Sequence, residues 1–224
     1  MIKIIYQILS ELGLIFLYPI SAIIIKLLPQ KALQAKGSGK PLLIVERWMT
    51  VNIRHLYWKY YLQRQGFRVY ILNLPLYEGR FEDSSRKLSR FINSKELSDV
   101  VLVGISSGAL TSIMYLEELG GWDRVSKFVS IGAPFRGTWS AIFILFARSG
   151  WEMLPNSNFT KRIRAYKLKK PESVLCISAR FDEMVPYGSS LSGAHKYTID
   201  VVGHNNLHLR VKSTYKKIVE FASS

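Results

Sequence analysis

Short aliphatic runs alternate with longer amphipathic segments along most of the chain after residue 40. Each run is rich in β-branched or aliphatic side chains and is followed by turn residues, which is the pattern of a strand. The predicted strands are residues 42–45, 68–72, 100–103, 127–131, 174–178 and 196–201. The clearest predicted helices are residues 53–63, 84–91, 109–119 and 207–221. Strands that alternate with helices predict an α/β fold, with a mostly parallel sheet of about six strands and helices on both faces.

The first 28 residues follow a different pattern, because Ile and Leu dominate them and residues 12–25 carry no charge. Polar or helix-breaking residues interrupt the first 28 residues, whereas a bilayer span takes ~20 mostly apolar residues. A tilted span and a helix lying in the interface are therefore both compatible with it. The interrupting residues are Lys3, Gln7, Glu11 and Pro19. We expect residues 1–36 to form a hydrophobic, membrane-associated segment and linker; the alternative is a buried core helix.

The positive net charge of the chain favours binding to an anionic surface. The chain has 31 Lys and Arg against 16 Asp and Glu, a formal net charge of +15. Such a charge favours phospholipid headgroups or nucleic acid phosphates. The sequence contains no recognisable nucleic-acid-binding module and no interleaved basic and aromatic run, so nucleic acid is not the expected partner. The basic residues that follow the apolar segment place the main domain on the cytoplasmic side.

The number of cysteines excludes two kinds of site. Cys176 is the only cysteine and lies in an apolar run, which excludes an intrachain disulfide and a metal thiolate cluster. We expect this thiol to be buried and inert.

The predicted strand 100–103 runs directly into Gly104-Ile105-Ser106-Ser107-Gly108, and a helical stretch begins at Ala109. This is a G-x-S-x-G motif between a strand and a helix, the setting in which its serine is a nucleophile. The two glycines remove Cβ atoms that would collide in so tight a turn. We therefore predict that Ser106 attacks a substrate carbonyl and that the Ser107 N–H donates to the oxyanion.

A nucleophilic serine needs a histidine base, and four histidines limit the search. His204 is preferred because it follows the strand-like residues 197–202 in a loop. His208 is the competitor, expected to line the site or to pack. His55 lies in an early amphipathic helix and His195 in a polar turn.

The acid that orients the base is predicted to be Asp182. It comes directly after the strand at residues 174–178, at the edge where open parallel sheets gather their active sites. The chain order Ser, Asp, His is also the order of an α/β-hydrolase triad. Glu183 and Asp200 are weaker candidates for this role.

At these residues the chain resembles the α/β-hydrolase superfamily, and within it the lipase-like branch of small bacterial triacylglycerol lipases and acyl-inositol deacylases. The resemblance covers residues 41–224 and implies an α/β-hydrolase domain there. Residues 129–138 are similar to the family's G-A-P-x-x-G segment, and residues 182–186 and 203–204 to its acid and histidine loops. One departure is Glu46-Arg47-Trp48, where lipases usually carry His-Gly. The second oxyanion donor would then be the N–H of Arg47 or Trp48.

Residues 138–170 form a possible lid or cap. Its first part is apolar and aromatic, from Trp139 to Phe146, and would cover an acyl pocket in water and open at an interface. Its second part is basic and could face anionic lipid. The basic residues are Lys161, Arg162, Arg164, Lys167, Lys169 and Lys170. The alternative is an ordinary core helix followed by a solvated basic face.

Together these features predict a serine hydrolase that cleaves carboxylic esters, with a lipid or small-molecule ester as substrate. No metal or organic cofactor is implied. Two alternatives stay open: an acyltransferase, in which an alcohol replaces water, and a non-catalytic membrane adaptor that has kept the fold.

Overall fold

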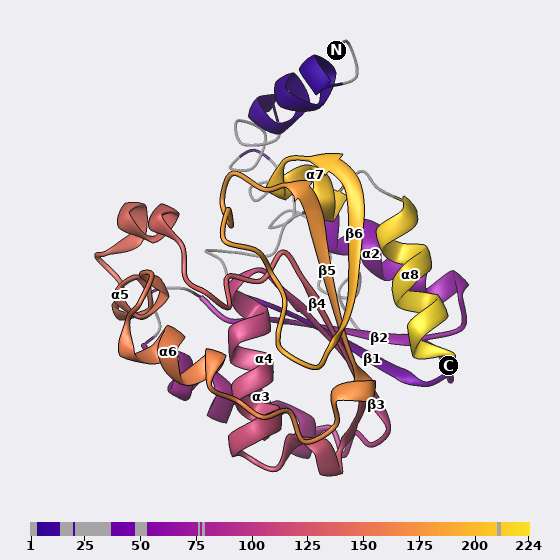
Figure 1. Ribbon diagram of the computed structural model, residues 1–224. Coiled ribbons are helices and arrows are strands. Elements are labelled where there is room, and N and C mark those ends of the chain that lie inside the picture. Colours follow the sequence, from indigo (N-terminus) through magenta and orange to yellow (C-terminus); the bar gives the residue numbers. More distant parts are fainter. Residues whose placement is uncertain are drawn as a thin grey trace.

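The computed structural model describes residues 4–13, 20, 37–47, 53–75, 77, 79–209 and 212–224 (Figure 1). Within these residues six strands form one sheet in the order β2-β1-β3-β4-β5-β6, and all neighbouring strands are parallel. The strands are β1 (Pro41–Glu46), β2 (Arg68–Asn73), β3 (Val100–Ile105), β4 (Val125–Ile131), β5 (Val174–Phe181) and β6 (His195–Val202). Each contains one predicted strand, so the predicted α/β fold class is confirmed.

Helices cover both faces of the sheet, as predicted (Figure 1). They are α2 (Ile53–Arg64), α3 (Phe81–Ser94), α4 (Ser107–Glu118), α5 (Arg148–Met153), α6 (Asn158–Arg164), α7 (His204–Leu209) and α8 (Lys212–Ala222). The 3-10 turns in the described part of the chain are η2 (Gly121–Asp123), η3 (Trp139–Ile144) and η4 (Pro171–Ser173). The predicted helix 207–221 is represented by α7 and α8, and α7 begins three residues earlier, at His204.

The two faces of the sheet carry separate hydrophobic cores. Side chains of α3 and α4 pack on one face, and those of α2 and α8 pack on the other. Every residue of β3 is buried, as expected for a central strand covered on both sides. Cys176 lies in β5 and is buried, and its burial raises the pKa of its thiol. The predicted buried cysteine is thus confirmed.

The strand order creates a crevice for a site. From β1 the chain moves outward to β2 and then returns to β3 on the other side of β1. At such a reversal the connections leave the carboxyl ends of the two strands in opposite directions, which opens a crevice above them. Arg47 follows β1 and Ser106 follows β3, so both predicted oxyanion and nucleophile segments begin at this point.

A further helix covers residues 4–13 and lies beyond the carboxyl ends of the strands, next to α7 (Figure 1). Its aliphatic side chains are exposed, which contradicts the buried-core-helix alternative for these ten residues. The exposed residues are Ile4, Ile5, Tyr6, Ile8, Leu9 and Leu12. Among the described residues, no helix has both the length and the apolar character needed to cross a bilayer. Most of the predicted membrane segment 1–36 lies outside them, namely residues 1–3, 14–19 and 21–36.

Candidate active site

Ser106 occupies the sharp turn between β3 and α4. Its backbone has φ 50° and ψ −122°, a conformation that L-residues other than glycine rarely adopt. The flanking glycines make the turn possible: a Cβ on Gly104 would lie 2.5 Å from the Ala109 Cα, and one on Gly108 would lie 2.2 Å from the Val45 carbonyl oxygen. This turn, Gly104 to Gly108, is called the elbow below. It packs closely between α4 and β1, which fixes the direction of the Ser106 side chain.

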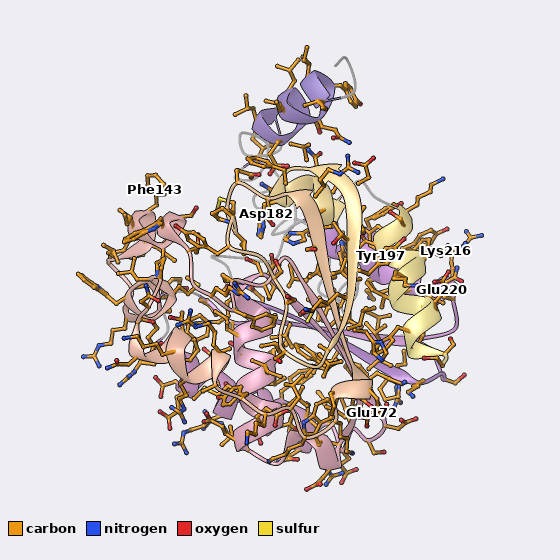
Figure 2. All side chains as sticks on the ribbon, in the orientation of Figure 1. Phe143, Glu172, Asp182, Tyr197, Lys216 and Glu220 are labelled. Carbon is orange, nitrogen blue, oxygen red and sulfur yellow. The ribbon has the colours of Figure 1, made fainter. Side chains whose placement is uncertain are left out.

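His204 and Asp182 meet Ser106 from the last two strands of the sheet. The His204 Nε2 lies 3.1 Å from the Ser106 Oγ, and its Nδ1 lies 2.8 Å and 3.0 Å from the two Asp182 carboxylate oxygens. An ionised carboxylate only accepts, so Nδ1 carries the proton and Nε2 offers its lone pair to the serine hydroxyl. Asp182 is itself held by the backbone N–H groups of Met184 and Val185, at 3.0 Å and 2.8 Å. Figure 2 shows Asp182 at the end of the sheet near α7.

Three carboxylates affect the pKa of the His204 imidazole. Burial alone would lower the pKa of His204, but the charge and hydrogen bond of Asp182 outweigh it, with help from Glu183 and Glu11, and the pKa is raised. Glu183 also accepts the backbone N–H of His204, at 3.1 Å and 3.3 Å. Desolvation and the charges of Glu11 and Asp182 raise the pKa of Glu183 in turn. The weaker acid candidate Glu183 thus contacts the histidine backbone, whereas Asp182 contacts the ring.

The other histidines take different places. His208 is buried and packs edge-on against His204, with ring centroids 4.5 Å apart. Gly132, in the G-A-P-x-x-G segment, makes room for both rings: it has φ 57°, and a Cβ there would lie 3.1 Å from the His204 Cε1 and from the His208 Nε2. His195 begins β6 and packs on Phe221. The His55 side chain lies outside the described residues.

The predicted oxyanion donors are the backbone N–H groups of Ser107 and of Arg47 or Trp48. Ser107 is the first residue of α4 and directly follows Ser106, so its N–H has no acceptor within the helix. The Ser107 hydroxyl donates to the Arg47 carbonyl oxygen at 3.0 Å, which ties the segment after β1 to the elbow. The Arg47 side chain is buried, with its guanidinium 4.4 Å from the Phe81 ring centroid and donating to the Gly79 carbonyl. Trp48 lies outside the described residues.

A pocket of about 110 Å³ opens beside Ser106. One wall comes from the predicted lid and the other from the acid loop. Its lining residues are Ser106, Ser107, Pro134, Thr138, Ser140, Ala141, Phe143, Ile144, Met153, Met184 and Val185. Thr138 connects the two walls, since its hydroxyl donates to the Met184 carbonyl. The pocket is therefore bounded by the segment predicted to cover an acyl group.

The predicted lid consists of η3, α5 and α6 rather than one core helix. Phe143 is 84% exposed and lies at the pocket, clear of the rest of the fold (Figure 2). Other exposed apolar residues of this segment are Trp139, Ile142, Phe146 and Trp151. The basic part runs elsewhere: Arg162 pairs with Glu118, and the Lys169 Nζ donates to the Glu117 carbonyl, both at the carboxyl end of α4. That end lies at the amino-terminal edge of the strands, opposite Ser106, because α4 runs antiparallel to β3.

Two contacts at this site were missed by sequence reasoning. Glu11, from helix 4–13, contacts the backbone of the His204 segment. Gly132, directly after β4, leaves room for the two histidine rings. Glu11 is separated from this segment by most of the chain, and no local pattern signals the pairing. The sequence marks Gly132 only as part of the G-A-P-x-x-G segment. Among the described residues, no group of three or more His, Cys, Asp or Glu side chains is arranged to hold a metal ion.

Comparison with known proteins identifies the fold. No model of a known protein family matches the sequence, and no curated protein matches it significantly. The chain is similar to the crystal structure of a bromoperoxidase from Bacillus anthracis, with a TM-score of 0.64 and 18% identity over 85% of this chain and 94% of that one. It is also similar to an esterase from Exiguobacterium antarcticum, with a TM-score of 0.62 and 16% identity over 85% and 94% of the two chains.

A third similar structure is an α/β hydrolase enzyme from a sediment metagenome of the Mar Chica lagoon in Morocco. Its TM-score is 0.63 at 19% identity, over 84% of this chain and 92% of that one. The chain has the α/β-hydrolase fold. At these identities the likeness extends to the fold alone and assigns no activity.

Proposed function

We propose that this protein is a serine hydrolase that cleaves carboxylic esters, with Ser106 as nucleophile, His204 as general base and Asp182 as the acid that orients it. The main support is a series of two hydrogen bonds. The Ser106 Oγ lies 3.1 Å from the His204 Nε2, and the His204 Nδ1 lies 2.8 Å from the Asp182 carboxylate. A serine hydroxyl is a weak nucleophile until an adjacent base removes its proton. This arrangement, on a strained strand-to-helix turn, supplies that base.

In the first half of the reaction, the Ser106 Oγ attacks the ester carbonyl carbon while its proton passes to the His204 Nε2. The Asp182 carboxylate keeps the proton on Nδ1 and stabilises the imidazolium that forms. The Ser107 N–H donates to the oxyanion, and the backbone N–H of Arg47 or Trp48 is the proposed second donor. The imidazolium then protonates the alkoxide, the alcohol leaves and an acyl-Ser106 ester remains.

In the second half, water takes the place of the alcohol. His204 removes a proton from the water as its oxygen attacks the acyl carbon, and the imidazolium returns the proton to Ser106 as the carboxylic acid leaves. The reaction includes no redox step, and the enzyme returns to its starting state. An alcohol bound in place of water would instead give acyl transfer, which product analysis distinguishes.

The pocket indicates the kind of acyl group. Its volume of about 110 Å³ is well below the ~300–1,000 Å³ of typical ligand pockets. A short acyl chain is therefore accommodated as the pocket stands, and a longer chain requires movement of η3. Phe143, which lines the pocket and is largely exposed, is placed to contact both the acyl chain and an apolar surface. We therefore propose lipid esters as the substrate class, with short soluble esters also cleaved.

Membrane association is part of the proposal. Helix 4–13 exposes most of its aliphatic side chains near the carboxyl edge of the sheet, and η3 exposes Phe143 and Ile142 next to the pocket. An exposed apolar face of this kind is typical of a helix that lies in a lipid interface. The net charge of +15 favours anionic lipid. We propose that the enzyme acts at a membrane surface, with its domain on the cytoplasmic side.

The test is hydrolysis of short and long p-nitrophenyl esters in detergent micelles, comparing wild type with Ser106→Ala, His204→Ala and Asp182→Asn. We expect each substitution to lower kcat by about 10⁴-fold or more. A fluorophosphonate probe should label wild type and not Ser106→Ala. Addition of an acceptor alcohol shows whether the acyl group goes to water or to the alcohol.

The assignment fails if wild type neither turns over these esters nor reacts with the probe, or if Ser106→Ala retains wild-type activity. The first result favours a non-catalytic role for the fold. The second assigns the hydrolysis to a different group or to a contaminant.

A further inference from the structure

Glu11 lies against the chain that carries the candidate base. Its side chain is 6% exposed, although it belongs to a helix whose other long side chains are mostly solvent-exposed. One carboxylate oxygen accepts the Asn205 backbone N–H and the Asn205 side-chain amide, both at 2.7 Å. The other accepts the Asn206 backbone N–H at 2.8 Å. These two backbone N–H groups belong to the first turn of α7, where no intrahelical acceptor exists.

Two neighbours of Glu11 make further contacts with the same segment. The Gln7 side chain accepts the Val202 N–H at 3.2 Å, and the Gln7 carbonyl accepts from the Asn206 amide at 2.9 Å. Ser10 donates to the Asn206 side chain at 2.9 Å. Residues 7, 10 and 11 share one face of a helix. Helix 4–13 is therefore docked by its polar face, and the docking partner is the β6–α7 connection.

The fit at this contact is close. Gly203, immediately before His204, has φ 110°, and a Cβ at that position would lie 2.2 Å from a Glu11 carboxylate oxygen. Only a residue without a side chain allows the carboxylate to reach the backbone N–H groups of Asn205 and Asn206. The N–H groups of residues 204–206 are thus all taken by carboxylates, Glu183 accepting the first and Glu11 the next two.

We propose that Glu11 is a positioning residue for His204: it holds the first turn of α7 so that the imidazole stays between Ser106 and Asp182. The proposal rests on the proposed serine hydrolase function. Glu11 touches neither substrate nor the reacting atoms, and it acts through the backbone of α7. Helix 4–13, which the sequence presents only as a membrane-seeking segment, is on this reasoning also a structural part of the active site.

The pKa of His204 distinguishes a positioning role of Glu11 from a general loss of packing. Among the residues that the structure describes, the charged and titratable groups around the His204 ring are Asp182, Glu183, Glu11 and His208. The negative charge of Glu11 is among the causes that raise the pKa of His204. Neutralising Glu11 should therefore lower that pKa and move the acidic limb of the kcat/KM profile to lower pH. A loss of packing alone would not move this limb.

The experiment compares wild type with Glu11→Ala, Glu11→Gln and Glu11→Asp, using the full chain in detergent micelles and p-nitrophenyl butyrate as substrate. Active sites are titrated with a fluorophosphonate so that kcat refers to folded enzyme. The His204 ring is titrated by NMR, with His204→Gln for assignment. Glu172→Gln is the matched control, because it removes one carboxylate at the opposite end of the molecule (Figure 2).

We expect Glu11→Ala and Glu11→Gln to lower kcat per titrated site at least tenfold with little change in KM, and to lower the ring pKa of His204. Glu11→Asp keeps the charge and should recover part of kcat and most of the pKa. Glu172→Gln should match wild type. The proposal is overturned if the Glu11 variants keep wild-type kcat and ring pKa. A fall in kcat with an unchanged ring pKa and acidic limb also overturns it, in favour of a purely structural role.

The ring titration separates this proposal from the proposed function. If wild type cleaves no ester and yet Glu11→Gln lowers the ring pKa of His204, the hydrolase assignment fails and the positioning contact stands. If wild type is an active esterase and Glu11→Gln changes neither kcat nor ring pKa, the hydrolase assignment stands and the positioning role fails.

Discussion

Replacement of Ser106 by glycine should stabilise the protein relative to replacement by alanine, although both variants lack the Ser106 hydroxyl. The reason is the backbone at φ 50° and ψ −122°, which strains any residue with a Cβ. Such strain costs about 1–3 kcal/mol. Glycine at an unstrained position costs about 0.5–1 kcal/mol against alanine, because it has more freedom to lose on folding. The difference leaves Ser106→Gly more stable by about 1 kcal/mol.

Thermal unfolding measures this difference directly. For a chain of this size, 1 kcal/mol corresponds to about 2–4 °C in Tm. Because both variants lose the hydroxyl and its contact with His204, that contact cancels in the comparison. The same pair of substitutions at Ser89, inside α3, is the control: there glycine should be less stable than alanine by about 1 kcal/mol, the ordinary helix result. If Ser106→Gly is also the less stable of its pair, the elbow is not strained.

Four further predictions follow from the structure. Gly132→Ala should lower both Tm and kcat, because a Cβ at φ 57° meets the His204 and His208 rings at 3.1 Å; unchanged kcat per titrated site would show that the rings do not depend on this space. Ester hydrolysis should rise through an apparent pKa above the ordinary 6.5 of histidine, because the raised pKa of His204 keeps the base protonated to higher pH. The same shift contributes stability that is fully present below pH 6.5 and is lost as pH rises through the raised pKa. The advantage of wild type over His204→Gln in urea unfolding should therefore shrink as pH rises above 6.5. Ile5→Gln combined with Leu9→Gln should weaken co-sedimentation with anionic phospholipid vesicles about tenfold or more, with hydrolysis of a soluble ester unchanged; equal binding would remove this face from the membrane contact.

The features predicted well from sequence are those that short stretches encode. Central strands such as β1 and β3 are predictable because a parallel strand that is buried on both faces reads as an unbroken aliphatic run. The elbow was visible because its glycines sit within two residues of Ser106, and the structure shows the close approach that each must allow. The sheet order then brings the ends of β3, β5 and β6 together, which is why a base and an acid sought after later strands lie within reach of the serine.

The start of α7 was predicted less well, for a reason that lies outside the segment itself. The sequence places His204 in a loop and begins the helix at residue 207, whereas the structure begins it at His204. The early start depends on acceptors for the first N–H groups, and these come from Glu183 and Glu11. Glu11 is separated by 194 residues from Asn205, so no reading of the local sequence includes it.

The polar and apolar faces of helix 4–13 have linked consequences. Its polar face holds the α7 turn through Glu11, Gln7 and Ser10, and its opposite face exposes aliphatic side chains such as Leu9, which is 64% exposed. A surface that binds the exposed face while the helix is docked stabilises the docked state by mass action. Given the positioning role proposed for Glu11, lipid that contacts this helix would favour the productive geometry of His204. Activation at a lipid interface would then begin at the histidine, in addition to any movement of η3 over the pocket.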